Sequence, residues 1–179
     1  ILAALNTEGI SKIIEKDITR DHTEIMLESF GADIDIKNEN EYKHISIIGK
    51  KELTAKNINV PSDLSSSAFF IVACLINKNS KLTLKNININ PSRNGILRAL
   101  KKMKAKIDIK NKRFLNNEIV ADLIIKSSKL QGVELDKEIA KLMIDEYPIL
   151  SVAASFAESK SIFKGLKELK IKESNRLEL

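Results

Sequence analysis

The chain has 179 residues, a net charge of +6, 43% hydrophobic residues and only 4% aromatic residues, so its core must be built from aliphatic side chains. The positive charge favours anionic partners such as phosphorylated metabolites or nucleic acid, but the basic residues are scattered, which weakens the nucleic-acid interpretation. A single cysteine excludes an internal disulfide framework. With no signal peptide and no apolar stretch long enough to span a membrane, we expect a cytoplasmic protein.

Both ends of the sequence have the pattern of helices that have been cut. The chain opens on ILAAL, which we expect to be the tail of a buried helix, and closes on RLEL, which we expect to be the first turn of another. We therefore expect a fragment of a longer protein, truncated at both ends, that holds only part of a functional site.

An internal duplication is the strongest signal between these ends. Residues 20–36 (RDHTEIMLESFGADIDI) and 93–109 (RNGILRALKKMKAKIDI) align without gaps and share an arginine, a leucine, an alanine and a closing Ile-Asp-Ile. Each copy follows a helix-like and a strand-like run, and strand-like alternation follows it. A third copy begins at PILSVAASFAES. The repeat predicts the order helix, strand, helix, strand, strand.

Two apolar runs predict the first helices of the second and third repeats. Ser62 and Asp63 are suitable N-caps before the run AFFIVACLI, which includes Cys74, and Pro148 fits the first turn of the run ILSVAASFA. Both runs are apolar on every side, so we expect helices enclosed by sheets, with Cys74 as a plain core residue.

An arginine precedes the second helix of each repeat, at Arg20, Arg93 and Arg176. A cation is mildly unfavourable at a helix N-terminus, whereas an anion is stabilised there. The pattern indicates that some of these arginines hold something negative. The alternative is that the side chains reach into water, and this alternative has more weight for Arg93.

Five stretches together resemble the EPSP synthase (3-phosphoshikimate 1-carboxyvinyltransferase) family, in its bacterial class II form. They are TRDHTEIML, VPSDLSSSAFFIVACLI, NINPSRNGILRALKKMKAKIDI, MIDEYPILSVAASFAES and LKELKIKESNRL. The resemblance runs from end to end in the same order. IDEYP together with KESNR is its most specific part.

This resemblance implies an α/β fold of two domains, each an inside-out α/β barrel of three βαβαββ units with helices inside and sheets outside. Residues 1–59 would be the last part of one domain, and residues 60–179 would be the first half or more of the second. The NINVPSD segment would then cross the interdomain hinge, and the active site would lie in the interdomain cleft.

The resemblance also implies transfer of the enolpyruvyl group of phosphoenolpyruvate to the 5-hydroxyl of shikimate 3-phosphate, through a tetrahedral intermediate and with release of phosphate. This is a step of the shikimate pathway of aromatic amino acid biosynthesis. No cofactor or metal is expected, no nucleic-acid or membrane partner, and the parent protein would be a monomer. Both substrates carry a phosphate and a carboxylate, so the site must gather cations.

Four candidate catalytic and binding residues follow from the family's motifs. Asp145 would accept a proton and bind the shikimate ring, while Lys172 would contact both substrates. Glu173 would exchange a proton with the methylene carbon, and Arg176 would bind phosphoenolpyruvate. The alternatives are that Asp145 merely caps a helix and that the other three residues form a solvated helix start.

Thr19 and Arg20 correspond to residues that hold the shikimate phosphate from the opposite domain, with threonine in place of the usual serine. Ser62 replaces a usual glycine, Asn175 replaces the aspartate of KESDR, and Glu168 stands where some members have a substrate-binding asparagine. These departures leave the alternative that the parent protein is a diverged relative of the family without enzymatic activity.

Two other functions compete with this one. The sister enzyme UDP-N-acetylglucosamine enolpyruvyl transferase shares the fold, but the RDHTE and KESNR motifs argue against it. A non-enzymatic anion- or RNA-binding protein would fit the positive charge, but it predicts clustered basic residues interleaved with aromatic ones. We expect the isolated fragment to be inactive, because other site residues of the family lie outside it.

Overall fold

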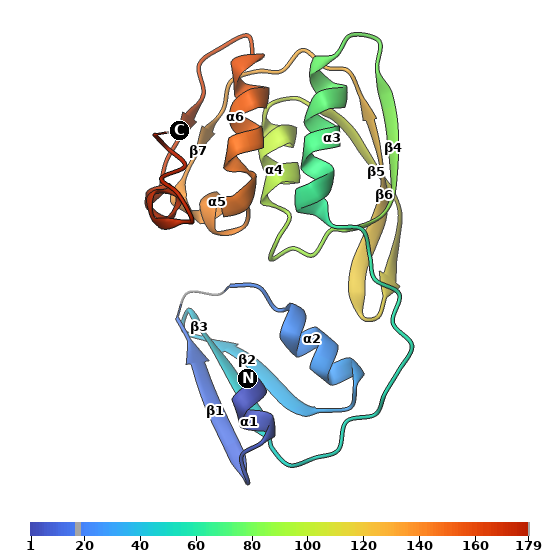
Figure 1. Cartoon of the computed structure of the whole chain (residues 1–179), viewed down its shortest axis with the longest axis vertical. Coiled ribbons are helices and arrows are strands. Elements are labelled where there is room, and N and C mark those ends of the chain that lie inside the picture. The colour runs from blue at the N-terminus through green and yellow to red at the C-terminus, as the bar shows by residue number, and fades with distance from the viewer. Residues whose placement is uncertain (17–18, 179) are drawn as a thin grey trace. The chain divides into compact units, whose positions relative to one another are not determined.

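The computed structural model describes residues 1–16 and 19–178. The chain divides into two compact units, which we call unit 1 (Ile1–Val60 with Phe114–Glu118) and unit 2 (Pro61–Arg113 with Ile119–Leu179) (Figure 1). None of the described helices combines the length and the apolar character needed to cross a bilayer.

Unit 1 contains one copy of the repeat. Its elements are α1 (Leu2–Leu5), β1 (Ile10–Glu15), α2 (His22–Ser29), β2 (Asp33–Glu39) and β3 (Tyr42–Ile48). The sheet has the order β1-β3-β2, and both pairings are antiparallel. Alternation along β3 places Lys43, Ile45 and Ile47 on one buried face, so a lysine shares the face that carries the small core of this unit.

Unit 2 contains a second full copy and the start of a third. The second copy comprises α3 (Leu64–Ile76), β4 (Lys81–Asn88), α4 (Gly95–Lys102), β5 (Lys106–Leu115) and β6 (Glu118–Lys126). Its sheet has the order β4-β6-β5, which repeats the strand order of unit 1. The predicted repeat is therefore confirmed.

The remainder of unit 2 connects the second copy to the third and begins the latter. It comprises β7 (Glu134–Leu135), α5 (Lys137–Lys141), η1 (Ile144–Glu146), α6 (Tyr147–Ser155), β8 (Ile162–Phe163) and η2 (Lys167–Ile171), where η denotes a 3₁₀ helix. Strands β7 and β8 form a short parallel pair. Pro148 lies in the first turn of α6, as its position in the sequence predicts.

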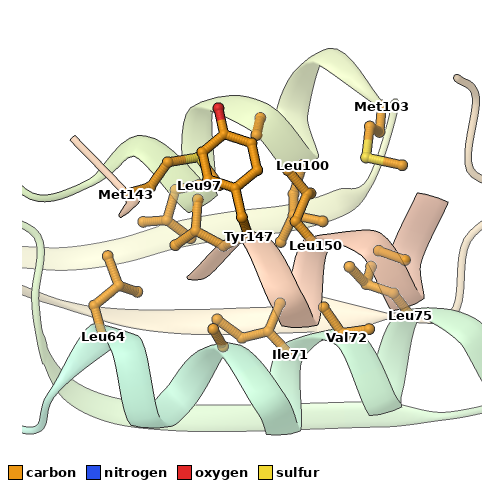
Figure 2. Close-up of a cluster of buried hydrophobic side chains, with 14 of the residues drawn as sticks. Leu64, Ile71, Val72, Leu75, Leu97, Leu100, Met103, Met143, Tyr147 and Leu150 are labelled. Carbon is orange, nitrogen blue, oxygen red and sulfur yellow. The ribbon is translucent and has the colours of Figure 1, made fainter. Parts of the chain in front are cut away.

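The core of unit 2 lies between α3, α4, α6 and the sheet (Figures 1 and 2). Figure 2 shows Ile71 and Val72 of α3 facing Leu150 of α6, with Leu100 of α4 beside them. The ring of Tyr147 packs edge-on against that of Phe163, with centroids 5.5 Å apart. Cys74 is buried, as predicted, and burial raises the pKa of its thiol.

Three sequence predictions about the helices are wrong. Neither apolar helix is enclosed on every side, because Phe69 and Phe70 of α3 are 59% and 63% exposed and Val152 of α6 is 42% exposed. The first helix is not buried either, since Leu2 is 65% exposed and only Ala4 of α1 is buried. Of the closing RLEL, residues 176–178 form a turn rather than a helix, and residue 179 lies outside the described residues. A helix that is enclosed needs apolar side chains on every face. Enclosure also requires other helices or strands that pack on each face, and the composition of the helix does not provide these.

Candidate active site

The acidic residue of the IDEYP motif lies where a 3₁₀ turn meets a helix. Asp145 is the middle residue of η1, and its neighbours Ile144 and Glu146 are both buried. Its own side chain is 39% exposed. The two buried neighbours leave the Asp145 side chain directed outward from the turn.

The KESNR segment returns to Asp145 because the chain turns back after η2. Leu169 is buried and anchors η2, and the backbone N–H of Arg176 donates to the carbonyl of Leu169 at 2.9 Å. The side chain of Asn175 accepts from the N–H of Leu177 at 3.3 Å, so this asparagine can form the local turn in which an aspartate is usual.

Two cations converge on the Asp145 carboxylate. Lys172 Nζ lies 3.5 Å from Asp145 Oδ1, and an Arg176 guanidinium nitrogen lies 3.6 Å from the same oxygen. The Lys172 and Arg176 side chains are 23% and 26% exposed. The structure therefore brings these three predicted residues together at one partly open position in unit 2.

Glu173 joins this cluster through Arg176, whose guanidinium donates to Glu173 Oε2 at 2.6 Å. A hydrogen bond from its own backbone N–H, followed by that from Arg176, holds the pKa of Glu173 below its usual range. Glu168 pairs with Lys172 at 2.8 Å. Its hydrogen bond is the largest influence that raises the pKa of Lys172, and Asp145 adds to the effect.

The two remaining predicted residues lie in unit 1, in the segment before α2. Thr19 and Arg20 are both exposed, and the Thr19 hydroxyl donates to Glu15 Oε1 at 2.5 Å. Glu15 Oε2 also lies 3.5 Å from Lys43 Nζ, which pairs in turn with the buried Glu24. The Thr19 hydroxyl, which stands where a serine is usual, is therefore held by Glu15 next to a buried ion pair.

Arg93 does not reach into water, so the alternative interpretation of this residue is wrong. Its guanidinium lies 3.0 Å from Asp63 Oδ1 and donates to Ser65 Oγ at 2.8 Å. Asp63 is the N-cap of α3, as predicted, and accepts from the N–H of Ser66 at 2.7 Å. The arginine before α4 therefore holds a carboxylate of its own unit.

Sequence reasoning missed the polar side chains that lie behind Asp145. Glu146 is only 1% exposed, and one of its oxygens accepts from the Ser65 hydroxyl. Burial raises the pKa of Glu146, although Ser65 and Arg93 act against this. No local sequence signal marks Glu146 as inward-facing, because the neighbouring Asp145 is charged as well. Among the described residues, no group of histidine, cysteine, aspartate and glutamate side chains is arranged to hold a metal ion.

The αβαββ repeats, with the charged cluster beside η1, place the chain among proteins of the enolpyruvyl-transferase fold. The enolpyruvyl transferase NikO of Streptomyces tendae matches 92% of this chain and 37% of its own with a TM-score of 0.65 and 17% identity, which shows the fold alone. An EPSP synthase structure from Acinetobacter baumannii matches 99% of this chain and 39% of its own, with a TM-score of 0.89 and 41% identity. The predicted fold class is confirmed.

The family model for EPSP synthase (3-phosphoshikimate 1-carboxyvinyltransferase) matches residues 1–179, so the chain belongs to the EPSP synthase family. It is 48% identical over 178 residues to the 3-phosphoshikimate 1-carboxyvinyltransferase of Brucella abortus (strain S19) and 47% identical to that of Pseudomonas sp. (strain PG2982). Each alignment covers 99% of this chain and 40% of the relative, so the chain spans 40% of the length of these relatives.

Proposed function

We propose that this chain supplies the Asp145, Lys172, Glu173 and Arg176 part of an active site that transfers the enolpyruvyl group of phosphoenolpyruvate to the 5-hydroxyl of shikimate 3-phosphate. The observation that carries the proposal is the convergence of Lys172 and Arg176 on Asp145, at 3.5 and 3.6 Å. Membership of the EPSP synthase family supports the substrate assignment.

The charge balance of the cluster favours an exchange of partners when anionic substrates bind. Lys172 and Arg176 are paired with Asp145, Glu168 and Glu173. A phosphate and a carboxylate offer these cations more charge and a bidentate geometry for the guanidinium. Both side chains then face the position where negative charge develops in the tetrahedral intermediate, which lowers the barrier.

The same exchange prepares the two carboxylates for proton transfer. The backbone N–H of Glu173 and then the Arg176 guanidinium lower the pKa of Glu173 while the two side chains are paired. When Arg176 moves to phosphoenolpyruvate, that influence falls, and Glu173 can carry the proton that reaches the methylene carbon during addition and returns during elimination. Asp145, released from the two cations, is placed to accept the proton of the attacking hydroxyl.

The proposal extends to unit 1 and to the cleft. Thr19 and Arg20 would hold the phosphate of shikimate 3-phosphate, from a domain that includes residues 1–59, against a domain that includes residues 60–179. The division of the chain beside residue 60 supports the domain boundary in this proposal. A monomeric, cytoplasmic parent that needs no cofactor, nucleic acid or membrane belongs to the same proposal.

A chimera tests the function. We would replace the matching 178-residue segment of the Brucella abortus enzyme by this chain and assay phosphate release with both substrates. We expect activity, and a loss of about 10²–10⁴-fold in kcat for Asp145→Asn and for Glu173→Gln. Lys164→Met, which breaks an exposed pair with Glu134, is the matched control and should leave kcat unchanged.

Several results would contradict the proposal. An inactive chimera that folds normally would favour the diverged-relative alternative, and turnover of UDP-N-acetylglucosamine as acceptor would favour the sister enzyme. Salt-sensitive RNA binding without turnover would favour a nucleic-acid binder. The unmodified 179-residue chain should show no turnover by itself, and activity of that chain would show that the remaining site residues are dispensable.

A further inference from the structure

A polar network lies behind Asp145, on the buried side of η1. Ser65 of α3 donates to Glu146, and Arg93 donates to the same Ser65 oxygen at 2.8 Å. Arg93 also pairs with Asp63 at 3.0 Å. The network therefore links the N-terminus of α3, the segment before α4, and the residue that follows Asp145 in the chain.

The geometry of η1 makes the orientation of one side chain depend on its neighbour. A 3₁₀ helix has three residues per turn, so consecutive side chains point in directions about 120° apart. Glu146 is fixed inward by Ser65, and Ile144 is buried as well. Holding Glu146 in place therefore fixes the direction in which the Asp145 carboxylate leaves the turn.

Filling this space with polar side chains costs folding stability. Glu146 is 1% exposed, and two buried atoms, Glu146 Oε2 and Arg93 Nε, have no hydrogen-bond partner in the part of the chain that the structure describes. Buried charges with incomplete hydrogen bonding cost stability, and apolar side chains of similar volume often serve packing equally well or better. Its presence beside Asp145 therefore points to a purpose other than packing.

We infer that Arg93, Ser65 and Glu146 form a positioning network that aims the Asp145 carboxylate at Lys172 and Arg176. These three residues touch neither substrate in this scheme and act only through Asp145. The inference rests on the proposed function for its catalytic consequence, whereas the orientation of Asp145 can be measured without any turnover.

The first experiment uses the 179-residue chain and the NMR signals of the Lys172 ε-methylene group. Asp145→Asn defines how these signals move when the Asp145 charge is removed. Ser65→Ala should move them in the same direction, and it should have no further effect in the Asp145→Asn background. Ser67→Ala is the matched control, because Ser67 lies on the same helix and donates to the Asp63 carbonyl at 2.7 Å.

The second experiment measures kcat and KM across pH in the chimera described above. Ser65→Ala should lower kcat by about tenfold or more, with little change in KM for phosphoenolpyruvate, because a small misplacement of a catalytic group is costly. Ser65→Thr restores the hydroxyl and should recover most of the activity. Ser67→Ala should retain kcat even where it lowers stability.

The outcomes separate the inference from the proposed function. An inactive unmodified chimera would refute the function and leave the NMR experiment to decide the orientation. Unchanged Lys172 signals in Ser65→Ala, or equal kcat values for the two alanine variants, would overturn the positioning network. If Ser65→Ala does not fold, Arg93→Lys serves instead: altered Lys172 signals support the network, and unaltered signals refute it.

Discussion

Replacement of Lys43 by methionine should strongly destabilise unit 1. The Lys43 side chain is 5% exposed and that of its partner Glu24 is 3% exposed, so methionine would leave a buried carboxylate without its cation. Breaking a buried pair by removing one partner costs about 3–5 kcal/mol. Glu15, 3.5 Å from Lys43, also loses its cation, but its side chain is 25% exposed and accepts from Thr19, so Glu24 dominates the cost.

Hydrogen exchange of the β3 amides provides the assay, because β3 is the central strand and carries Lys43. A loss of about 3–5 kcal/mol corresponds to roughly a hundredfold to several thousandfold faster exchange, at about tenfold per 1.4 kcal/mol. Lys51→Met is the matched control. Its pair with Asp33 is 52% and 44% exposed, so about 0–1 kcal/mol is expected.

A second change distinguishes the loss of charge pairing from the loss of packing. In the double variant Lys43→Met with Glu24→Leu, both buried charges are replaced by apolar side chains, and protection should return to within about 1 kcal/mol of the unmodified chain or exceed it. Equal exchange rates for Lys43→Met and Lys51→Met would refute the reasoning, because burial would then have no bearing on the value of the pair.

Other predictions concern unit 2. Burial raises the pKa of Glu146 above 4.5. The contribution of this side chain to folding stability is therefore present below that pH and is lost as the pH rises through the folded-state pKa. Glu146→Gln should remove this pH dependence and raise the free energy of unfolding at pH 7, as measured by urea titration. Gly132→Ala should destabilise the unit by about 1–3 kcal/mol, because a Cβ there would lie 2.2 Å from the Lys160 carbonyl oxygen, and a thermal melt would show it. Asp63→Ala should cost about 1 kcal/mol through loss of the α3 cap, with Ser80→Ala on an exposed loop as control. Tyr147→Phe should raise the melting temperature, because the buried hydroxyl has no hydrogen-bond partner among the described residues and burial raises its pKa to about 12; a lower melting temperature would contradict this.

The sequence predicts the repeat well because its signals are local. Ile-Asp-Ile lies near the start of the strand that follows each second helix, and the cap of α3 and the proline of α6 lie next to the elements they define. The short β7 and α5 were missed, although Asp136 caps α5 by accepting from two backbone N–H groups. A strand of two residues carries too little alternation to be recognised.

Contacts between distant residues account for what the sequence could not provide. Ser65 and Glu146 are 81 residues apart, and Arg93 joins them from a third segment. Nothing near Glu146 in the sequence indicates that its side chain turns inward. The exposure of Phe69 and Phe70 has a similar origin, because the composition of a helix does not fix how many of its faces have a packing partner.

The strand order of both sheets has a consequence for synthesis on the ribosome. In each complete repeat the strand made last, β3 or β6, occupies the centre of the sheet, and the strand made first, β1 or β4, lies at its edge and pairs with that central strand. A nascent repeat therefore cannot recruit its opening strand until its closing strand has left the exit tunnel. Each repeat should therefore complete its sheet in one late step, in which strands distant in the sequence pair. A pause in translation before the last strand, β3 or β6, has emerged would leave the earlier strands unpaired and prone to misassociation.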